Sequence, residues 1–182
     1  MSTLHAELRR HTSDLHAVLD ASLPFLSDTL SRSSYADFLS RLFAWLEPTA
    51  HEIAARLPDA DLEVAMVHSS EWLAEDLSAL GMPLPGAAPN QALPVIQSPA
   101  HAVGCWYVVE GSALGGQVIC RHVQRLLGLT PSTGVRYFAG AGAHTGERWG
   151  AVCAALERYN GATADVVEGA RRGFRSLQAW LA

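Results

Sequence analysis

Apolar residues recur at three- and four-residue steps along most of the chain, which is the period of a helix rather than of a strand. The first segment shows this spacing at Leu4, Leu8, Leu15 and Leu19. Ser2 or Thr3 is a suitable N-cap for this segment, and Pro24 is expected to end it. The pattern therefore predicts an N-terminal helix of about five turns.

Two further helical segments follow before a proline-rich connector. Residues 35–57 keep the helical spacing but contain Pro48, which we expect to kink or split the helix. Residues 62–80 form a third segment, and Gly81 is a fitting C-cap for it. The connector, residues 81–99, holds five of the nine prolines, and residues 92–97 within it are expected to be a brief extended piece.

The second half of the chain predicts three more helices. Ser98 followed by Pro99 is typical of a helix start, and the helical pattern continues from there to Gly128. After a loop, two helices are expected at about 147–159 and 163–181. No segment alternates strictly and no internal repeat is present. The sequence thus predicts an all-α, multi-helix fold, with residues 1–182 as a single domain.

Composition narrows the class of protein. With 49% hydrophobic and 17% charged residues the chain has a folded, globular composition, and its net charge of −5 argues against broad nucleic-acid binding. No apolar run is long enough to span a membrane, and the first residues lack the apolar stretch of a signal peptide. Three cysteines without a CxxC pair indicate reduced thiols. We therefore expect a cytoplasmic protein.

Four glycines lie within the long helix predicted between Ser98 and Gly128, at positions 104, 111, 115 and 116. Each interior glycine costs about 0.5–1 kcal/mol relative to alanine, so the cluster needs a reason. Close helix–helix packing is one explanation. The other is a flat ligand lying on the backbone, since Gly111 and Gly115 share one helical face and the adjacent Gly116 favours a kink. Spacing alone does not decide between them.

The first helix offers a candidate metal ligand. His16 and Asp20 are one helical turn apart, so the carboxylate can orient the imidazole and raise its basicity toward a metal. A solvated histidine fits the same pattern. His5 and His11 lie on the same helix, and periodicity excludes neither of them.

Three stretches of the chain resemble haem oxygenases. Residues 8–16, LRRHTSDLH, with Leu19 and Asp20 after them, resemble the proximal helix of that family, in which a histidine follows a threonine by four residues. Residues 107–117, YVVEGSALGGQ, resemble the distal helix, particularly of the bacterial branch, and EGARRGFRSLQAWL resembles the last core helix. The most similar bacterial members are often associated with phytochromes that need biliverdin.

On the proximal side, the resemblance implies a haem oxygenase-like fold with haem sandwiched between a proximal and a glycine-kinked distal helix. His16 would then be the iron ligand and Asp20 its hydrogen-bonding partner. Arg9 stands where the family places a basic residue near a haem propionate, although a solvated helix charge explains it equally well.

On the distal side, the resemblance places Gly111 and Gly115 against the haem, with Tyr107 and Gly116 also in the haem-binding segment. Gly111, Ser112 and Gly115 are the expected catalytic positions, because close backbone there would restrict how oxygen binds. Ser112 departs from animal-type members, which carry an aspartate that organises water. A serine can hold a water but supplies no carboxylate.

The implied activity is oxidative cleavage of haem to biliverdin, carbon monoxide and free iron. Haem would be both substrate and cofactor, and O2 would be used with electrons from a donor such as a ferredoxin or a flavin reductase. A neutral histidine ligand suits this chemistry better than a thiolate. A biliverdin-using phytochrome is a further expected partner.

Other functions remain open at this point. A non-catalytic haem- or biliverdin-binding protein on the same fold is kept open by Ser112. A di-iron oxidase would need a Glu-x-x-His element, which the sequence lacks. A thiaminase-like hydrolase would need a base beside a cysteine, and His101 and His122 share a predicted helix with Cys105 and Cys120. A purely structural helical module would leave the glycine cluster unexplained.

Overall fold

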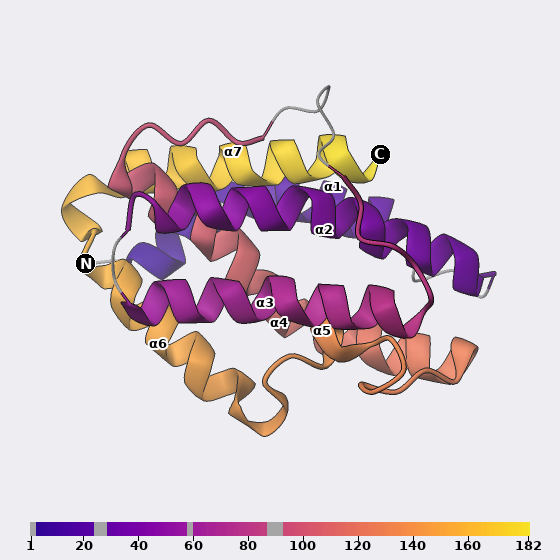
Figure 1. The fold of residues 1–182 in the computed structure, drawn as a ribbon. Coiled ribbons are helices and arrows are strands. Elements are labelled where there is room, and N and C mark those ends of the chain that lie inside the picture. Colours follow the sequence, from indigo (N-terminus) through magenta and orange to yellow (C-terminus); the bar gives the residue numbers. More distant parts are fainter. Residues whose placement is uncertain (1–2, 24–28, 58–59, 87–92) are drawn as a thin grey trace.

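The computed structural model describes residues 3–23, 29–57, 60–86 and 93–182, and within them the chain is helical (Figure 1). The α-helices in order are α1 (Leu4–Ser22), α2 (Arg32–Ala54), α3 (Ala60–Ala79), α4 (Pro99–Leu127), α5 (Arg136–Ala139), α6 (Thr145–Glu157) and α7 (Thr163–Leu181). Short 3-10 turns, η2 (Gly142–His144) and η3 (Asn160–Ala162), precede α6 and α7. These residues include no strand, so the all-α prediction is confirmed and the extended piece expected at 92–97 is not a strand over 93–97.

Capping residues set the helix ends as the sequence predicts. The Thr3 hydroxyl accepts a hydrogen bond of 3.2 Å from the Ala6 amide and begins α1. Ser98 caps α4 in the same way, with Pro99 in its first turn. Gly128 ends α4 in the left-handed region at φ 66°, where a side chain would be strained. Ser2 and Pro24, the other predicted boundary residues, lie outside the described residues.

Pro48 does not split the second helix, so of the two expected outcomes, a kink or a split, the split is wrong. α2 continues from Arg32 to Ala54 with the proline inside it. An interior proline costs about 3 kcal/mol or more, because it removes one helical hydrogen bond and crowds the preceding turn. Trp45, Leu46 and Ile53 on the same helix are all fully buried, and each such side chain contributes about 1.5–3 kcal/mol on burial. Tertiary packing therefore outweighs the local penalty.

Helices α4 and α7 cross in close contact. A Cβ built on Gly104 would lie 2.0 Å from the carbonyl oxygen of Val166. A Cβ on Gly169 would lie 2.3 Å from the carbonyl oxygen of His101. Both glycines are therefore required by backbone-to-backbone packing. In Figure 1, α4 runs diagonally across the molecule while α2, α3 and α7 lie nearly parallel to one another.

Helices α1 and α4 both lie on α7 and advance along it in the same direction. The contacts that show this are Asp14 with Arg171 and His16 with Phe174 from α1, and Cys105 with Gly169 and Val108 with Gly173 from α4. Packing on α7 therefore fixes the positions of α1 and α4 relative to each other. The candidate residues of both helices are positioned by this shared support.

The four-residue helix α5 was missed by the sequence analysis because its cap comes from another helix. Asp76, on α3, accepts hydrogen bonds from the amides of Arg136 (2.6 Å) and Tyr137 (2.8 Å). The Asp76 side chain is only 1% exposed. Burial raises its pKa to about 6, although the two amides act in the opposite direction. The carboxylate fixes α5, and with it Tyr137, against α3.

Candidate functional site

The structure separates the four α4 glycines into two kinds. Packing explains Gly104, as above, and Gly116, where a Cβ would lie 3.2 Å from the carbonyl oxygen of Phe138. Packing does not explain Gly111 or Gly115. A Cβ on Gly111 would come no closer to a neighbour than 3.9 Å, from the Trp149 ring, and a Cβ on Gly115 would meet nothing within 4 Å. Gly111 and Gly115 therefore form a bare strip of helix backbone, which we call the glycine face.

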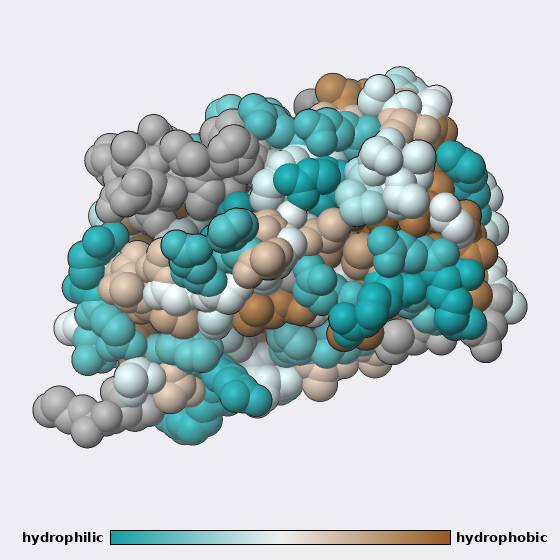
Figure 2. Space-filling model, turned by 90° about the horizontal axis from the view of Figure 1, so that it is seen from below, coloured by the Kyte–Doolittle hydropathy of each residue, from teal (hydrophilic) through white to brown (hydrophobic). Residues whose placement is uncertain are grey.

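Apolar side chains lie exposed beside the glycine face. Leu114 and Val118, on the same helix, are 43% and 53% exposed, and Val18 on α1 is 58% exposed. Figure 2, which views the molecule from the side of α5 and α6, shows hydrophobic residues exposed between hydrophilic ones. Exposed apolar side chains next to bare backbone are suited to a flat, largely apolar ligand.

His16 presents its imidazole at the surface of α1. Its side chain is 59% exposed, and its Nδ1 lies 2.9 Å from Oδ2 of Asp20. The ring also packs edge-on against Phe174 of α7, with 5.9 Å between ring centroids. A carboxylate on Nδ1 orients the ring so that Nε2 is the nitrogen available to a metal. The structure thus places the predicted His16–Asp20 pair together.

The two other histidines of α1 are placed differently. His5 packs against the rings of Trp149 and Tyr107, with centroid distances of 5.5 and 6.2 Å. His11 has its Nε2 3.4 Å from a carboxylate oxygen of Glu7. Of these three histidines, His16 is therefore the one whose Nδ1 is oriented by a carboxylate one turn ahead of it.

His16 and the glycine face lie on corresponding turns of their two helices. Tyr107 of α4 forms a hydrogen bond with Thr12 of α1. Four residues further along each helix stand Gly111 and His16. Because α1 and α4 advance along α7 in the same direction, these two residues follow the Thr12–Tyr107 contact on facing helices. The contact marks one end of the region between them.

Arg9 lies at this same end. Its charge acts on the Tyr107 phenol, while burial is the larger effect and raises the pKa of that phenol. Arg9 itself is exposed. A guanidinium and a phenol hydroxyl are both donors that a carboxylate group prefers.

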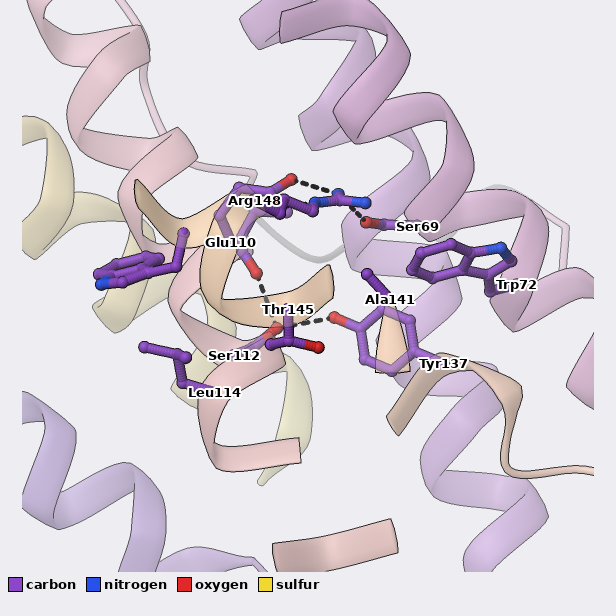
Figure 3. A pocket seen from close by; sticks show the side chains of 11 residues that line it. Ser69, Trp72, Glu110, Ser112, Leu114, Tyr137, Ala141, Thr145 and Arg148 are labelled. Atoms are coloured by element: carbon purple, nitrogen blue, oxygen red, sulfur yellow. Dashed lines mark hydrogen bonds and ion pairs between the residues drawn. The ribbon is translucent and has the colours of Figure 1, made fainter. Parts of the chain in front are cut away.

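Ser112 points its hydroxyl away from solvent into a hydrogen-bonded chain (Figure 3). Its Oγ donates to the carbonyl oxygen of Val109 (2.7 Å) and lies 2.9 Å from the hydroxyl of Tyr137. A serine has one proton, so Tyr137 must be the donor in the second bond. Burial raises the pKa of Tyr137 to about 12, which keeps its proton in place.

A pocket lies between α3, α4, α5 and α6, on the side of Ser112 and Tyr137. Its lining residues are Ser69, Trp72, Val109, Glu110, Ser112, Leu114, Tyr137, Ala141, Thr145, Arg148 and Trp149. Glu110 is 3% exposed and forms a two-pronged ion pair with Arg148, with both N···O distances at 2.8 Å. Figure 3 shows Arg148 between Glu110 and Ser69, to which it donates at 3.3 Å.

The sequence analysis missed Glu110, Arg148 and Tyr137. A carboxylate in the middle of a buried helix signals that a cation must pair with it. The sequence does not say which of its thirteen arginines does so. Tyr137 gave no signal, since its placement depends on the tertiary cap of α5.

The structure disfavours the cysteine and di-iron alternatives. Burial raises the pKa of Cys105 to about 12, and the thiol donates to the carbonyl oxygen of Gly169 at 3.2 Å. Burial also raises the pKa of Cys120 and of Cys153. A nucleophilic thiol needs the opposite shift. Among the described residues, no group of three or more His, Cys, Asp or Glu side chains is arranged to hold a metal ion.

Together these features define a helical protein with an accessible histidine on one helix and a bare glycine face on the facing helix. The family model described as "Heme oxygenase" matches residues 2–182. The chain therefore belongs to the haem oxygenase family, whose members bind haem, and this confirms the sequence-based identification of the family.

Individual relatives agree with this assignment. Heme oxygenase of Xanthomonas campestris pv. campestris (strain 8004) is 35% identical over 111 residues, which is 60% of this chain and 65% of that protein, or slightly under two thirds of its length. The fold is similar to the NO- and CO-bound heme oxygenase from Neisseria meningitidis, with a TM-score of 0.80, 24% identity, and coverage of 100% of this chain and 91% of that chain.

A second structure supports the same fold. Heme oxygenase from Leptospira interrogans superposes with a TM-score of 0.76 at 19% identity, covering 99% of this chain and 98% of that chain. The predicted haem oxygenase-like all-α fold is thus confirmed. The assignment of residues 1–182 to one domain and the individual site residues stay predictions. No described helix is both long and apolar enough to cross a membrane.

Proposed function

We propose that this chain binds haem between α1 and α4 and cleaves it oxidatively to biliverdin, carbon monoxide and iron. The observation that carries the proposal is the glycine face. Gly111 and Gly115 are not required by any helix contact, and they stand on α4, which contacts the His16 helix α1 through Tyr107. Bare backbone at this place is what a flat macrocycle needs, because side chains would hold it away.

His16 is proposed as the iron ligand through Nε2. Asp20 holds the ring by accepting from Nδ1 and so raises the basicity of the other nitrogen. Phe174 packs against the imidazole edge and limits its rotation. An exposed imidazole with two such supports is preorganised for a ligand arriving from solvent.

The glycine face is proposed to lie close against the other side of the haem. Bound haem supplies the redox chemistry with O2, and its own ring is what is oxidised. The backbone at Gly111 and Gly115 restricts the space above the ring and orients what enters it. Gly116 has a structural role instead, because its missing side chain lets α4 pack closely against Phe138 of α5.

Arg9 and Tyr107 are proposed to hold the haem propionates. The charge of Arg9 acts on the Tyr107 phenol, at the end of the site marked by the Thr12–Tyr107 contact. A guanidinium and a phenol hydroxyl both donate to carboxylate oxygens. Their position fixes which edge of the haem points toward that end.

Ser112 is proposed as a positioning residue rather than a proton donor. Its hydroxyl donates a hydrogen bond to the carbonyl oxygen of Val109 and accepts one from the hydroxyl of Tyr137. The bond to Tyr137 ties the glycine segment of α4 to α5. The catalytic role that the sequence suggests for Ser112 stays a prediction.

An external donor of the ferredoxin or flavin-reductase kind is proposed to supply the electrons. The resemblance of residues 107–117 to the distal helix of bacterial members supports membership of the phytochrome-associated branch. In that case a biliverdin-using phytochrome receives the product.

The test is to mix the purified protein with haemin, add a reductant or reductase in air, and follow the visible spectrum. We expect a Soret band typical of histidine ligation that decays into biliverdin absorption. A stable Soret band without ring opening would instead identify a non-catalytic haem-binding protein. Absence of any haemin complex would contradict both.

A further inference from the structure

Trp149 of α6 stands where the glycine face begins. The edge of its indole lies 3.9 Å from the position of a Cβ on Gly111, whereas one turn further along α4 the space around Gly115 is open. The bare strip is therefore bounded at the Gly111 end by an aromatic ring and continues away from it.

Two aromatic contacts and the ion pair of the preceding residue hold this ring in place. Trp149 packs edge-on against His5 of α1 at 5.5 Å and tilted against Tyr107 of α4 at 5.9 Å between ring centroids. The preceding residue, Arg148, is fixed by its two-pronged ion pair with the buried Glu110. A side chain restrained in this way presents a rigid surface rather than an adaptable one.

Trp149 also adjoins the carboxylate-binding end of the site. Tyr107 contacts Trp149 directly and lies within the field of Arg9. Because propionates are flexible, charged contacts to them alone still allow a flat macrocycle to rotate in its own plane. A rigid apolar surface beside those contacts removes this freedom, because the ring edge can pack against it in one rotational setting.

We propose that Trp149 is the end wall of the haem site and a specificity-determining residue, which fixes the in-plane rotation of haem and hence which meso carbon is attacked. This inference rests on the proposed function, since it needs haem on the glycine face. The four meso carbons differ in their neighbouring substituents but not in intrinsic accessibility, so rotation within the site selects among them.

The test uses the ferric haem complex of Trp149→Ala and of the control Tyr159→Ala. Tyr159 follows the end of α6, ten positions after Trp149, and its ring is partly buried against the core rather than lining the pocket. The readouts are the paramagnetically shifted haem methyl resonances, the haemin affinity, and the biliverdin isomers formed.

For Trp149→Ala we expect a histidine-ligated complex with a second set of haem methyl resonances, a mixture of isomers, and haemin binding weakened by roughly two- to tenfold. Tyr159→Ala should keep the resonance pattern and isomer of the unsubstituted protein. An unchanged pattern and isomer in Trp149→Ala would overturn the proposal. If that variant does not fold, Trp149→Leu, which keeps apolar volume but removes the flat ring, decides in the same way. Failure of the unsubstituted protein to bind haemin would contradict the proposed function instead.

Discussion

At the scale of single residues, the site depends on side chains whose roles are set by one or two neighbours each. His16 is oriented by Asp20, and Ser112 is saturated by Val109 and Tyr137. The Ser112 bonds show why residue type alone misleads. A serine in this position looks available to a ligand, but its single proton is already donated to the helix.

Replacing His16 by alanine is expected to abolish the histidine-type spectrum of the haemin complex. The reason is the loss of the only α1 imidazole whose Nδ1 is oriented by a carboxylate one turn ahead. His11→Ala is the control on the same helix, since its ring lies against Glu7. The Soret spectrum of each ferric variant is the measurement, and loss of the normal band in His11→Ala but not in His16→Ala would refute the assignment.

Asp76 predicts a specific pH dependence of stability. Its folded pKa of about 6 lies above the ordinary 3.8, so the folded state binds the extra proton. The resulting stabilisation is fully present below the ordinary value and is lost as the pH rises through about 6. From pH 7 to pH 5 this group alone should add about 1 kcal/mol to the free energy of unfolding.

Denaturant unfolding of the unsubstituted protein and of Asp76→Asn at pH 7 and pH 5 measures this effect. The asparagine does not titrate, so the gain on acidification should be smaller in the variant by about that amount. Equal gains in both proteins would show that Asp76 is ionised with an ordinary pKa in the folded state.

At the scale of elements, α4 combines two uses of glycine in one helix. Gly104 and Gly116 admit neighbouring backbone, while Gly111 and Gly115 leave backbone bare. The first use is structural and stabilising. The second costs helix stability, and such a cost is expected to persist where the exposed backbone serves a ligand.

The two uses predict opposite effects of the same substitution. Gly115→Ala should stabilise the haem-free protein by about 0.5–1 kcal/mol, because a methyl group there meets open space and alanine favours a helix. Gly104→Ala should destabilise it by about 1–3 kcal/mol or more, because its methyl group would overlap the Val166 carbonyl.

Thermal unfolding without haem measures both effects, and haemin titration of Gly115→Ala completes the comparison. The added methyl group should weaken haemin binding even though the protein is more stable. Stabilisation together with unchanged haemin affinity would mean that the haem does not lie on Gly115.

At the scale of the whole molecule, the sequence predicted the six longer helices and the motifs on α1 and α4, but neither α5 nor the contacts that hold the helices together. Helical periodicity and caps such as Thr3 and Ser98 act locally, so they are visible in one stretch of chain. The α5 cap by Asp76 and the Glu110–Arg148 pair join residues 60 and 38 positions apart. Such pairings are set by how the helices pack, and no local pattern reveals them.

The same distinction explains Pro48 and the glycines. Local rules predict a kink or a split at Pro48, but burial of the surrounding apolar side chains keeps α2 continuous. Local rules place Gly111 and Gly115 on one helical face, but they do not decide between packing and a ligand as the reason for the α4 glycines. Only the packed structure shows which of them are filled by a neighbour and which remain bare.

The most direct test of the account is a crystal structure of the haem complex of the unsubstituted protein. We predict that the iron is bound by Nε2 of His16 and that the opposite face of the ring lies against Gly111 and Gly115. Iron bound by His5 or His11, or a ring that lies away from the glycine face, would contradict the account.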